Sequence, residues 1–242
     1  MAADKPGGGN LTIMDWQPVI DADWRALSFF NGSDSLFFDG FISTLTSGWT
    51  WLPLYVGWLY MVVKNNELSK VIAIISAVAC CLLLTEVMAE GVVKPLVARP
   101  RPLNDLVLGH TVDVVQGITA SDYSFFSAHA ANTMGLALFF CLLVRNTLFS
   151  LAMMLWTLVN GYTRLYLGMH FPFDVLTGFA WGAFVAIVVY AIYHFVERRL
   201  APKGNFISTQ YTKTGFSLVD IDVVICLFSL CFIYALFRAL FF

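Results

Sequence analysis

Residues 163–193 read TRLYLGMHFPFDVLTGFAWGAFVAIVVYAIY, a polar turn that leads directly into an apolar run. The apolar run has the length that a helix needs to cross a bilayer, which is about 20 residues. The polar turn carries Arg164, His170 and Asp174. Ionisable groups beside membrane-spanning segments are costly to keep there and usually serve a function. The stretch therefore predicts a membrane fold and marks the position of a site.

The composition of the whole chain supports a membrane protein. Of its 242 residues, 59% are hydrophobic and 12% are charged, whereas soluble domains have roughly 45–50% and about 25%. The apolar residues gather in blocks, and a barrel would show alternation instead. We therefore predict an all-α polytopic membrane protein of one domain. About six spans are expected, near residues 46–63, 71–90, 129–144, 148–163, 173–195 and 219–241.

The N-terminal region differs from the rest of the chain. Residues 1–10 are expected to be a disordered tail, and nothing in them indicates a cleaved signal peptide. Residues 11–45 mix aromatic and acidic side chains around a turn signal at Asn31-Gly32. They predict amphipathic helices at the membrane interface, or else a helix pair packed on the bundle. The membrane domain is expected to occupy residues 46–242.

The charge and the cysteine pattern argue against a nucleic-acid-binding protein and against a zinc site. The net charge is -2 and no basic stripe indicates a nucleic-acid partner. The five cysteines fall inside apolar blocks without zinc-ligand spacing, so we expect small buried or lipid-facing residues.

The loops between the predicted spans give an orientation. Basic residues of the odd-numbered loops are Lys64, Lys70, Arg145, Arg198, Arg199, Lys203 and Lys213. The positive-inside rule places these loops in the cytoplasm, and the N-terminal segment and even-numbered loops outside. The basic residues of the second loop oppose this rule, and phosphate binding would explain them.

A first polar island runs from Lys94 to Pro102. Arg101 offers a rigid fork for phosphate oxygens, and Lys94 adds a point charge. The alternative is a stop-transfer cluster that binds lipid headgroups. Glu90 is expected to pair with Lys94 or to face a wet cavity. Arg99 would gate headgroups or extend to the interface.

A second polar island, Ser127-Ala128-His129, opens the third predicted span. A serine before a helix is a good N-cap, and the same geometry aims backbone N–H groups at an anion. His129 is placed to protonate a leaving oxygen, or is an interface residue.

The third island is the turn with Arg164, His170 and Asp174. Asp174 lies four residues after His170, within reach of one imidazole nitrogen if the turn is helical. A carboxylate there would fix the tautomer and leave the other nitrogen as a nucleophile or base. Alternatively, Asp174 caps the fifth helix. Asn160, one turn before Arg164, is expected to bond to it.

The combined motif resembles the signature of the type 2 phosphatidic acid phosphatase superfamily, which shares its site with vanadium haloperoxidases. The matching residues are Lys94-x6-Arg101-Pro102, Ser127-x-His129 and Arg164-x5-His170-x3-Asp174. The resemblance covers about residues 46–195. The chain departs from the usual pattern with Phe126 in place of proline, Ala128 in place of glycine and Thr163 in place of serine.

This resemblance implies a role for each matching residue. His170 would attack phosphorus and form a phosphohistidine, and Asp174 would orient it. His129 would protonate the leaving group and then activate water. The phosphate would be held by Lys94, Arg101, Ser127, the Ala128 N–H and Arg164. The cations would supply the charge compensation that Mg²⁺ supplies elsewhere, so no metal and no cofactor is expected.

A site at the ends of membrane spans implies an amphiphilic substrate. The family implies undecaprenyl diphosphate, lipid A phosphates, phosphatidylglycerol phosphate or phosphatidic acid. We expect a bacterial inner-membrane enzyme whose site faces the periplasm. A lipid-to-lipid phosphotransferase would use the same phosphohistidine. A non-enzymatic transporter or scaffold would have little need of the His170–Asp174 pair.

Overall fold

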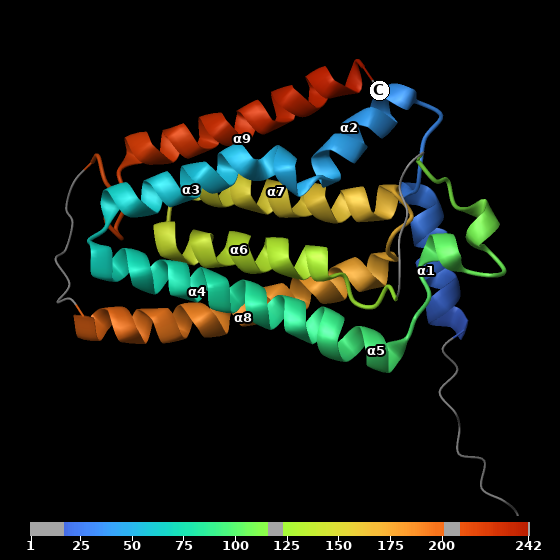
Figure 1. The fold of residues 1–242 in the computed structure, drawn as a ribbon, viewed down its shortest axis with the longest axis horizontal. Coiled ribbons are helices and arrows are strands. Elements are labelled where there is room, and N and C mark those ends of the chain that lie inside the picture. The colour runs from blue at the N-terminus through green and yellow to red at the C-terminus, as the bar shows by residue number, and fades with distance from the viewer. Residues whose placement is uncertain (1–16, 116–122, 201–208, 242) are drawn as a thin grey trace, which may run out of the picture.

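The computed structural model of the chain describes residues 17–115, 123–200 and 209–241, and Figure 1 shows how its helices are arranged. These residues form helices and turns with two isolated β-bridges, and they contain no β-strand. The predicted all-α class is therefore confirmed for the described part of the chain. The predicted tail over residues 1–10 lies outside it.

Among the described residues, six long helical stretches run side by side along the long axis of the molecule (Figure 1). They are α3 (Leu52–Asn65), the continuous α4 (Leu68–Glu86), η2 (Val87–Val93) and α5 (Lys94–Val97), then α6 (Ala128–Val144), α7 (Thr147–Tyr166), α8 (Pro172–Leu200) and α9 (Leu218–Ala239). Helix α6 packs against α4, α7 and α8, and it has buried residues on all of its faces. It is therefore the central helix of the bundle.

Glycines bring α6 and α8 into backbone contact. A Cβ atom added to Gly182 would lie 2.2 Å from the Ala131 carbonyl oxygen, and one added to Gly178 would lie 2.5 Å from the Ser127 carbonyl oxygen. Small residues at such contacts are typical of membrane helices, whose association depends on close packing. The contact fixes the start of α6 against the start of α8.

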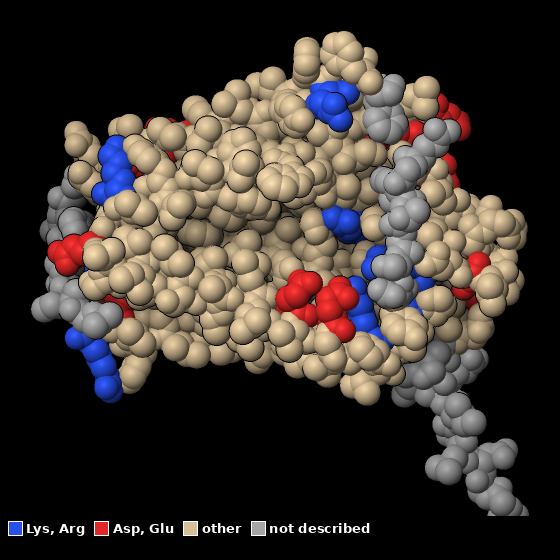
Figure 2. Space-filling model, viewed as in Figure 1, with Lys and Arg blue, Asp and Glu red and all other residues tan. Residues whose placement is uncertain are grey.

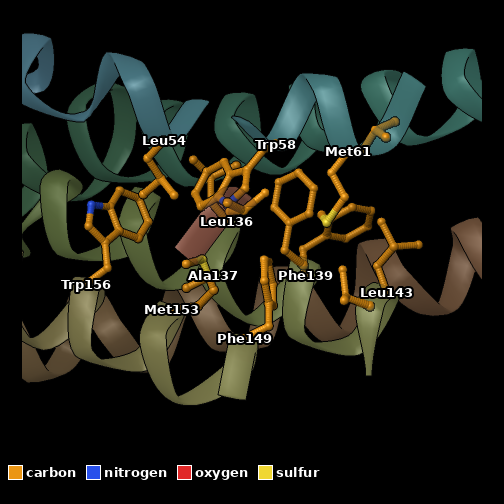
Figure 3. Close-up of a cluster of buried hydrophobic side chains, with 14 of the residues drawn as sticks. Leu54, Trp58, Met61, Leu136, Ala137, Phe139, Leu143, Phe149, Met153 and Trp156 are labelled. Atoms are coloured by element: carbon orange, nitrogen blue, oxygen red, sulfur yellow. The ribbon is translucent and has the colours of Figure 1, made fainter. Parts of the chain in front are cut away.

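Large side chains from α3, α6 and α7 pack together in the core. Figure 3 shows Leu54 and Trp58 of α3 pointing toward Phe139 of α6 and toward Met153 and Trp156 of α7. The Trp58 and Trp156 rings meet edge to face with their centroids 5.3 Å apart, an arrangement that aromatic pairs favour. This cluster anchors α3 to the central helix.

Three helical stretches of the described residues are long and apolar enough to cross a membrane: Leu68–Val97, Pro172–Arg199 and Leu218–Ala239. Their length and composition support a membrane protein, with α6 (Ala128–Val144) as a shorter apolar helix. The other predicted spans correspond to α3 and α7. The count of six spans remains a prediction.

Two helices precede the bundle, α1 (Gln17–Phe30) and α2 (Leu36–Thr46), and they are joined at Gly32, where φ is +66°. Helix α1 lies across one end of the bundle (Figure 1) and packs on α7 and α8, whereas α2 packs on α7 and α9. This packing agrees with the alternative prediction that residues 11–45 form a helix pair packed on the bundle. A position at the membrane interface remains a prediction.

Candidate active site

The three polar islands are joined by backbone hydrogen bonds at the end of the bundle where α6 and α8 begin. The first island is tied to the segment before the second, because the Ser124 N–H donates to the Arg99 carbonyl at 2.8 Å. The second is tied to the third, because the Ser127 N–H donates to the Asp174 carbonyl at 3.1 Å. Figure 2 shows basic side chains close together near this end, beside two adjoining acidic ones.

His170 lies at the centre of this arrangement and is 4% exposed. Its Nε2 atom is 3.2 Å from Nη1 of Arg101. Its Nδ1 atom is 3.7 Å from Oδ2 of Asp174, which is longer than a hydrogen bond. The imidazole is therefore held between a guanidinium on one side and a carboxylate on the other.

Burial lowers the pKa of His170 to about 4, and the charges of Arg101 and Arg164 add to this effect while Asp174 opposes it. Burial penalises the charged form of an imidazole. The imidazole is therefore neutral at neutral pH.

We expect His170 to stay neutral as the pH falls, until the pH approaches its pKa of about 4. Because the pKa in the folded protein is lowered, stability that depends on the neutral ring is present above the ordinary pKa and is lost only as the pH falls through the lowered one. The ¹⁵N shifts of the ring nitrogens in histidine-labelled protein measure this. A His170→Gln variant assigns the signal among the four histidines. Titration near the ordinary value of about 6.5 would contradict the expectation.

Asp174 is fully buried, and both of its oxygens are bound. Oδ1 accepts a hydrogen bond from Arg99 at 2.8 Å, and Oδ2 accepts one from the Phe171 N–H at 3.0 Å. The start of a helix favours a carboxylate because its N–H groups lack partners within the helix. Asp174 thus caps α8 and faces His170 with the same oxygen, and its role in fixing the tautomer of His170 stays a prediction.

Arg101 and Arg164 lie close enough to His170 to act on its charge, and Lys94 is a third buried cation. Arg101 is 9% exposed and donates from Nη1 to the Met169 carbonyl at 3.2 Å. Arg164 donates from Nη2 to the Thr46 carbonyl at 3.2 Å, and its Nε atom is buried without a partner. Lys94 is 4% exposed and pairs with Glu90, as its sequence position predicted.

Unusual backbone lies on both sides of Lys94. The stretch Val87–Val93 is π-helical, and Ala98 has a φ of +48°. Such insertions are frequent at functional sites because one extra residue rotates the following side chains. They turn the chain from α4 into the loop that carries Arg99 and Arg101.

His129 lies in the first turn of α6. Its Nε2 atom is 3.1 Å from Oδ1 of Asn160. The expected bond from Asn160 to Arg164 is wrong, because the short amide reaches across to α6 instead. Arg164 points away from it, toward Thr46 and the sulfur of Met169.

Ser127 is buried and caps α6, with its Oγ atom accepting a hydrogen bond from the Ala130 N–H at 3.3 Å. Ala128 is the first residue of the helix. The N–H groups of a first helical turn have no partner within the helix and favour anions. These two residues therefore offer an anion position beside His129.

A groove of about 690 Å³ extends from His129 along the bundle. Figure 2 shows the hollow on this face of the molecule. Its walls come from α3, α4, α6 and α7 and include Tyr55, Leu59, Ile75, Val78, Leu136 and Trp156. The groove is almost entirely apolar and has its polar residues, His129, Asn132 and Thr133, together on α6.

The sequence model of the PAP2 superfamily matches residues 69–198, which carry all three islands. The chain belongs to the PAP2 superfamily. The predicted family is thereby confirmed, and the chain is a phosphatase of this superfamily.

Two curated proteins and one solved structure are similar to this chain. The lipid A 4'-phosphatase of Bacteroides thetaiotaomicron is 37% identical over 183 residues, which cover 75% of this chain and 81% of that protein. The lipid A 4'-phosphatase of Porphyromonas gingivalis is 27% identical over 183 residues, which cover 75% and 77%. The crystal structure of Aquifex aeolicus LpxE has the same fold, with a TM-score of 0.54 and 22% identity over 69% of this chain and 94% of that one.

The departures from the PAP2 pattern have visible consequences. Phe126, which replaces proline, is buried and packs near Trp181 with ring centroids 6.4 Å apart. Ala128, which replaces glycine, adopts helical backbone and so needs no glycine. The Thr163 hydroxyl, which replaces that of serine, donates to the Asn160 carbonyl at 2.8 Å.

Two features of this PAP2 site differ from what the sequence indicated. Arg99 forms ion pairs with Asp23 and Asp174, which the sequence did not indicate, and a role in gating headgroups stays a prediction. Asp23 was missed altogether. It lies in α1, which has no motif, and only its burial between distant segments reveals it.

Proposed function

We propose that this protein is a lipid A 4'-phosphatase that works through a phosphohistidine on His170. The observation that carries the proposal is the contact of Arg101 with Nε2 of His170 at 3.2 Å. A guanidinium can only donate hydrogen bonds, so Nε2 accepts and carries the lone pair. The ring proton is then on Nδ1, which faces Asp174.

The first chemical step forms a bond between Nε2 of His170 and phosphorus and breaks the bond between phosphorus and the ester oxygen. The His170 ring then carries a positive charge, which the carboxylate of Asp174 stabilises. This step requires His129 to be protonated, a form that the negative charge of a bound phosphate favours, and His129 then gives its proton to the departing oxygen. The products of this step are the alcohol and the phosphohistidine.

The second step returns the enzyme to its starting state. His129, now neutral, takes a proton from water as the water oxygen attacks phosphorus. The bond between phosphorus and Nε2 breaks, inorganic phosphate leaves, and His129 is again protonated. The hydrogen bond that Nε2 of His129 donates to Oδ1 of Asn160 orients the imidazole for both transfers.

The phosphate oxygens would be held by the cations and the start of α6. Arg101 is buried, Arg164 is partly buried with its Nε atom shielded from solvent, and Lys94 adds a third charge. The Ser127 hydroxyl and the Ala128 N–H add hydrogen bonds. Phosphoryl transfer depends mainly on positioning and charge compensation, which fixed cations supply without a metal ion.

The apolar groove supports a lipid as the substrate. It begins at His129, so a phosphate placed between His129 and His170 leaves an attached chain beside the groove. Apolar surface of this kind suits an acyl chain that stays in the membrane. The relative that is 37% identical acts on lipid A, as its name states, and this favours a phosphorylated glycolipid over the other lipid phosphates.

The orientation follows from the basic loops. Lys64, Lys70 and Arg145 lie near the ends of helices at the opposite end of the bundle from His170 (Figure 1). By the positive-inside rule that end is cytoplasmic. The active site would then face the periplasm of a bacterial inner membrane.

The test is phosphate release from a panel of purified lipid phosphates in detergent, with mass spectrometry of the product to locate the phosphate removed. We expect lipid A to lose its 4'-phosphate at least about tenfold faster than undecaprenyl diphosphate, phosphatidylglycerol phosphate or phosphatidic acid, because a fitted site discriminates by differences in transition-state binding. Equal or faster release from another lipid would overturn the lipid A assignment.

Two controls separate this proposal from its alternatives. Release should continue in excess chelator, since the cations are side chains, and a loss that Mg²⁺ restores would contradict the metal-free mechanism. Release should also need no second lipid. A strict requirement for an acceptor lipid would identify a phosphotransferase instead.

A further inference from the structure

Arg99 holds the carboxylate behind the proposed nucleophile. Its Nη1 atom donates to Asp174 at 2.8 Å, and its Nη2 atom donates to Asp23 at 2.6 Å. Its guanidinium lies 3.8 Å from the centroid of the Phe171 ring. Two carboxylates and a ring face fix the plane of the guanidinium, and charge-assisted pairs of this kind are the strong ones.

Asp23 brings a second, separate segment into this arrangement. It lies in α1, before the residues that match the PAP2 superfamily, and it is 7% exposed. Its other oxygen, Oδ1, accepts a hydrogen bond from the Phe173 N–H at 2.9 Å. Asp23 therefore binds both Arg99 and the first turn of α8, in which Asp174 lies.

The summed charge explains why Asp174 alone would not stabilise the positively charged ring of His170. Arg99 with Asp174 alone sums to zero, which would leave little negative charge facing His170 when its ring becomes positive. With Asp23 included, two carboxylates and one guanidinium sum to -1. Asp23 thus restores the negative charge that the phosphohistidine needs, because charges in a buried site are screened weakly.

We propose that Asp23 is a positioning residue of the active site, which acts through Arg99 to orient Asp174 and to keep its negative charge available to His170. Helix α1 is then part of the catalytic apparatus. The inference rests on the proposed function of His170 and Asp174. It does not depend on which lipid is the substrate.

The experiment compares Asp23→Asn with Asp21→Asn, an exposed aspartate of the same helix that contacts only Gln17 among the described hydrogen bonds. Both are assayed on whichever lipid phosphate the wild-type protein hydrolyses fastest. We expect Asp23→Asn to lower kcat by roughly tenfold or more with little change in KM, within the range of coupling between contacting residues. Asp21→Asn should behave as wild type.

A double-mutant cycle separates this role from simple support of the fold. If Asp23 acts through Arg99, adding Asp23→Asn to Arg99→Gln should change kcat by less than about twofold. Losses that multiply would overturn the proposal, as would wild-type kcat in a folded Asp23→Asn protein.

A second substitution covers the case in which Asp23→Asn does not fold. Asp23→Ser keeps a small polar side chain at this position but lacks the charge that binds Arg99. A folded Asp23→Ser protein with lowered kcat supports the proposal. If neither variant folds while Asp21→Asn does, Asp23 is structural and the positioning role is rejected. Retained activity in His170→Ala would instead reject the proposed function.

Discussion

Replacement of His170 by alanine is expected to lower kcat by roughly 10⁴- to 10⁶-fold, the range found when a covalent nucleophile is removed. Among the described histidines, His170 is the one whose ring lies between a guanidinium at Nε2 and a buried carboxylate near Nδ1. Water would have to attack phosphorus directly, without the intermediate that divides the reaction into two easier steps.

The measurement is phosphate release together with ³²P labelling of the enzyme during turnover. Wild-type protein should yield an acid-labile, base-stable phosphoenzyme, and His170→Ala should yield none. His194→Ala is the matched control, because this histidine lies at the far end of α8 and pairs with Glu197. Substantial turnover by a folded His170→Ala protein would show that another group is the nucleophile.

Replacement of Asp174 by asparagine is expected to lower kcat by roughly 10³- to 10⁴-fold, as in other sites where an amide replaces the carboxylate behind a histidine. The amide nitrogen can donate to the imidazole and favour the wrong tautomer. It also removes the negative charge that pairs with Arg99, and breaking a buried ion pair costs about 3–5 kcal/mol of stability. Turnover and thermal stability should therefore both fall.

The loss of turnover and the loss of stability in Asp174→Asn can be measured separately. Asp222→Asn is the matched control, since Asp222 is an exposed acid at the opposite end of the bundle. Steady-state kinetics should be measured well below the melting temperature of the variant, where it is folded. A kcat within tenfold of wild type under these conditions would contradict the orienting role of Asp174.

The sequence was sufficient to predict those pairs of site residues that lie close together along the chain. Glu90 is four residues before Lys94 in one continuous helical stretch, and Asp174 is four residues after His170 across the turn that leads into α8, so the short separation along the chain brings each pair together. The family signature added Arg101 and Arg164. The all-helical class followed from apolar blocks that are long enough to cross a bilayer.

The residues that sequence analysis misplaced are those whose partners lie far along the chain. Asn160 is spaced to reach Arg164 but bonds to His129, because the choice depends on how α6 packs against α7. Arg99 is 76 residues from Asp23 and 75 from Asp174 in sequence. No periodicity or motif relates such positions, so only the packed structure shows which charges meet.

The glycine contact between α6 and α8 has a consequence for how such an enzyme can change its preference. The separation of His129 from Asp174 is set by two backbones that touch at Gly178 and Gly182, rather than by side chains that can be exchanged one at a time. The walls of the groove come largely from α3 and α4, which do not carry these groups. Substitutions there can accommodate acyl chains of a different length or number while the distances between the reacting groups stay the same, so the range of lipids accepted can diverge in evolution without loss of the chemistry.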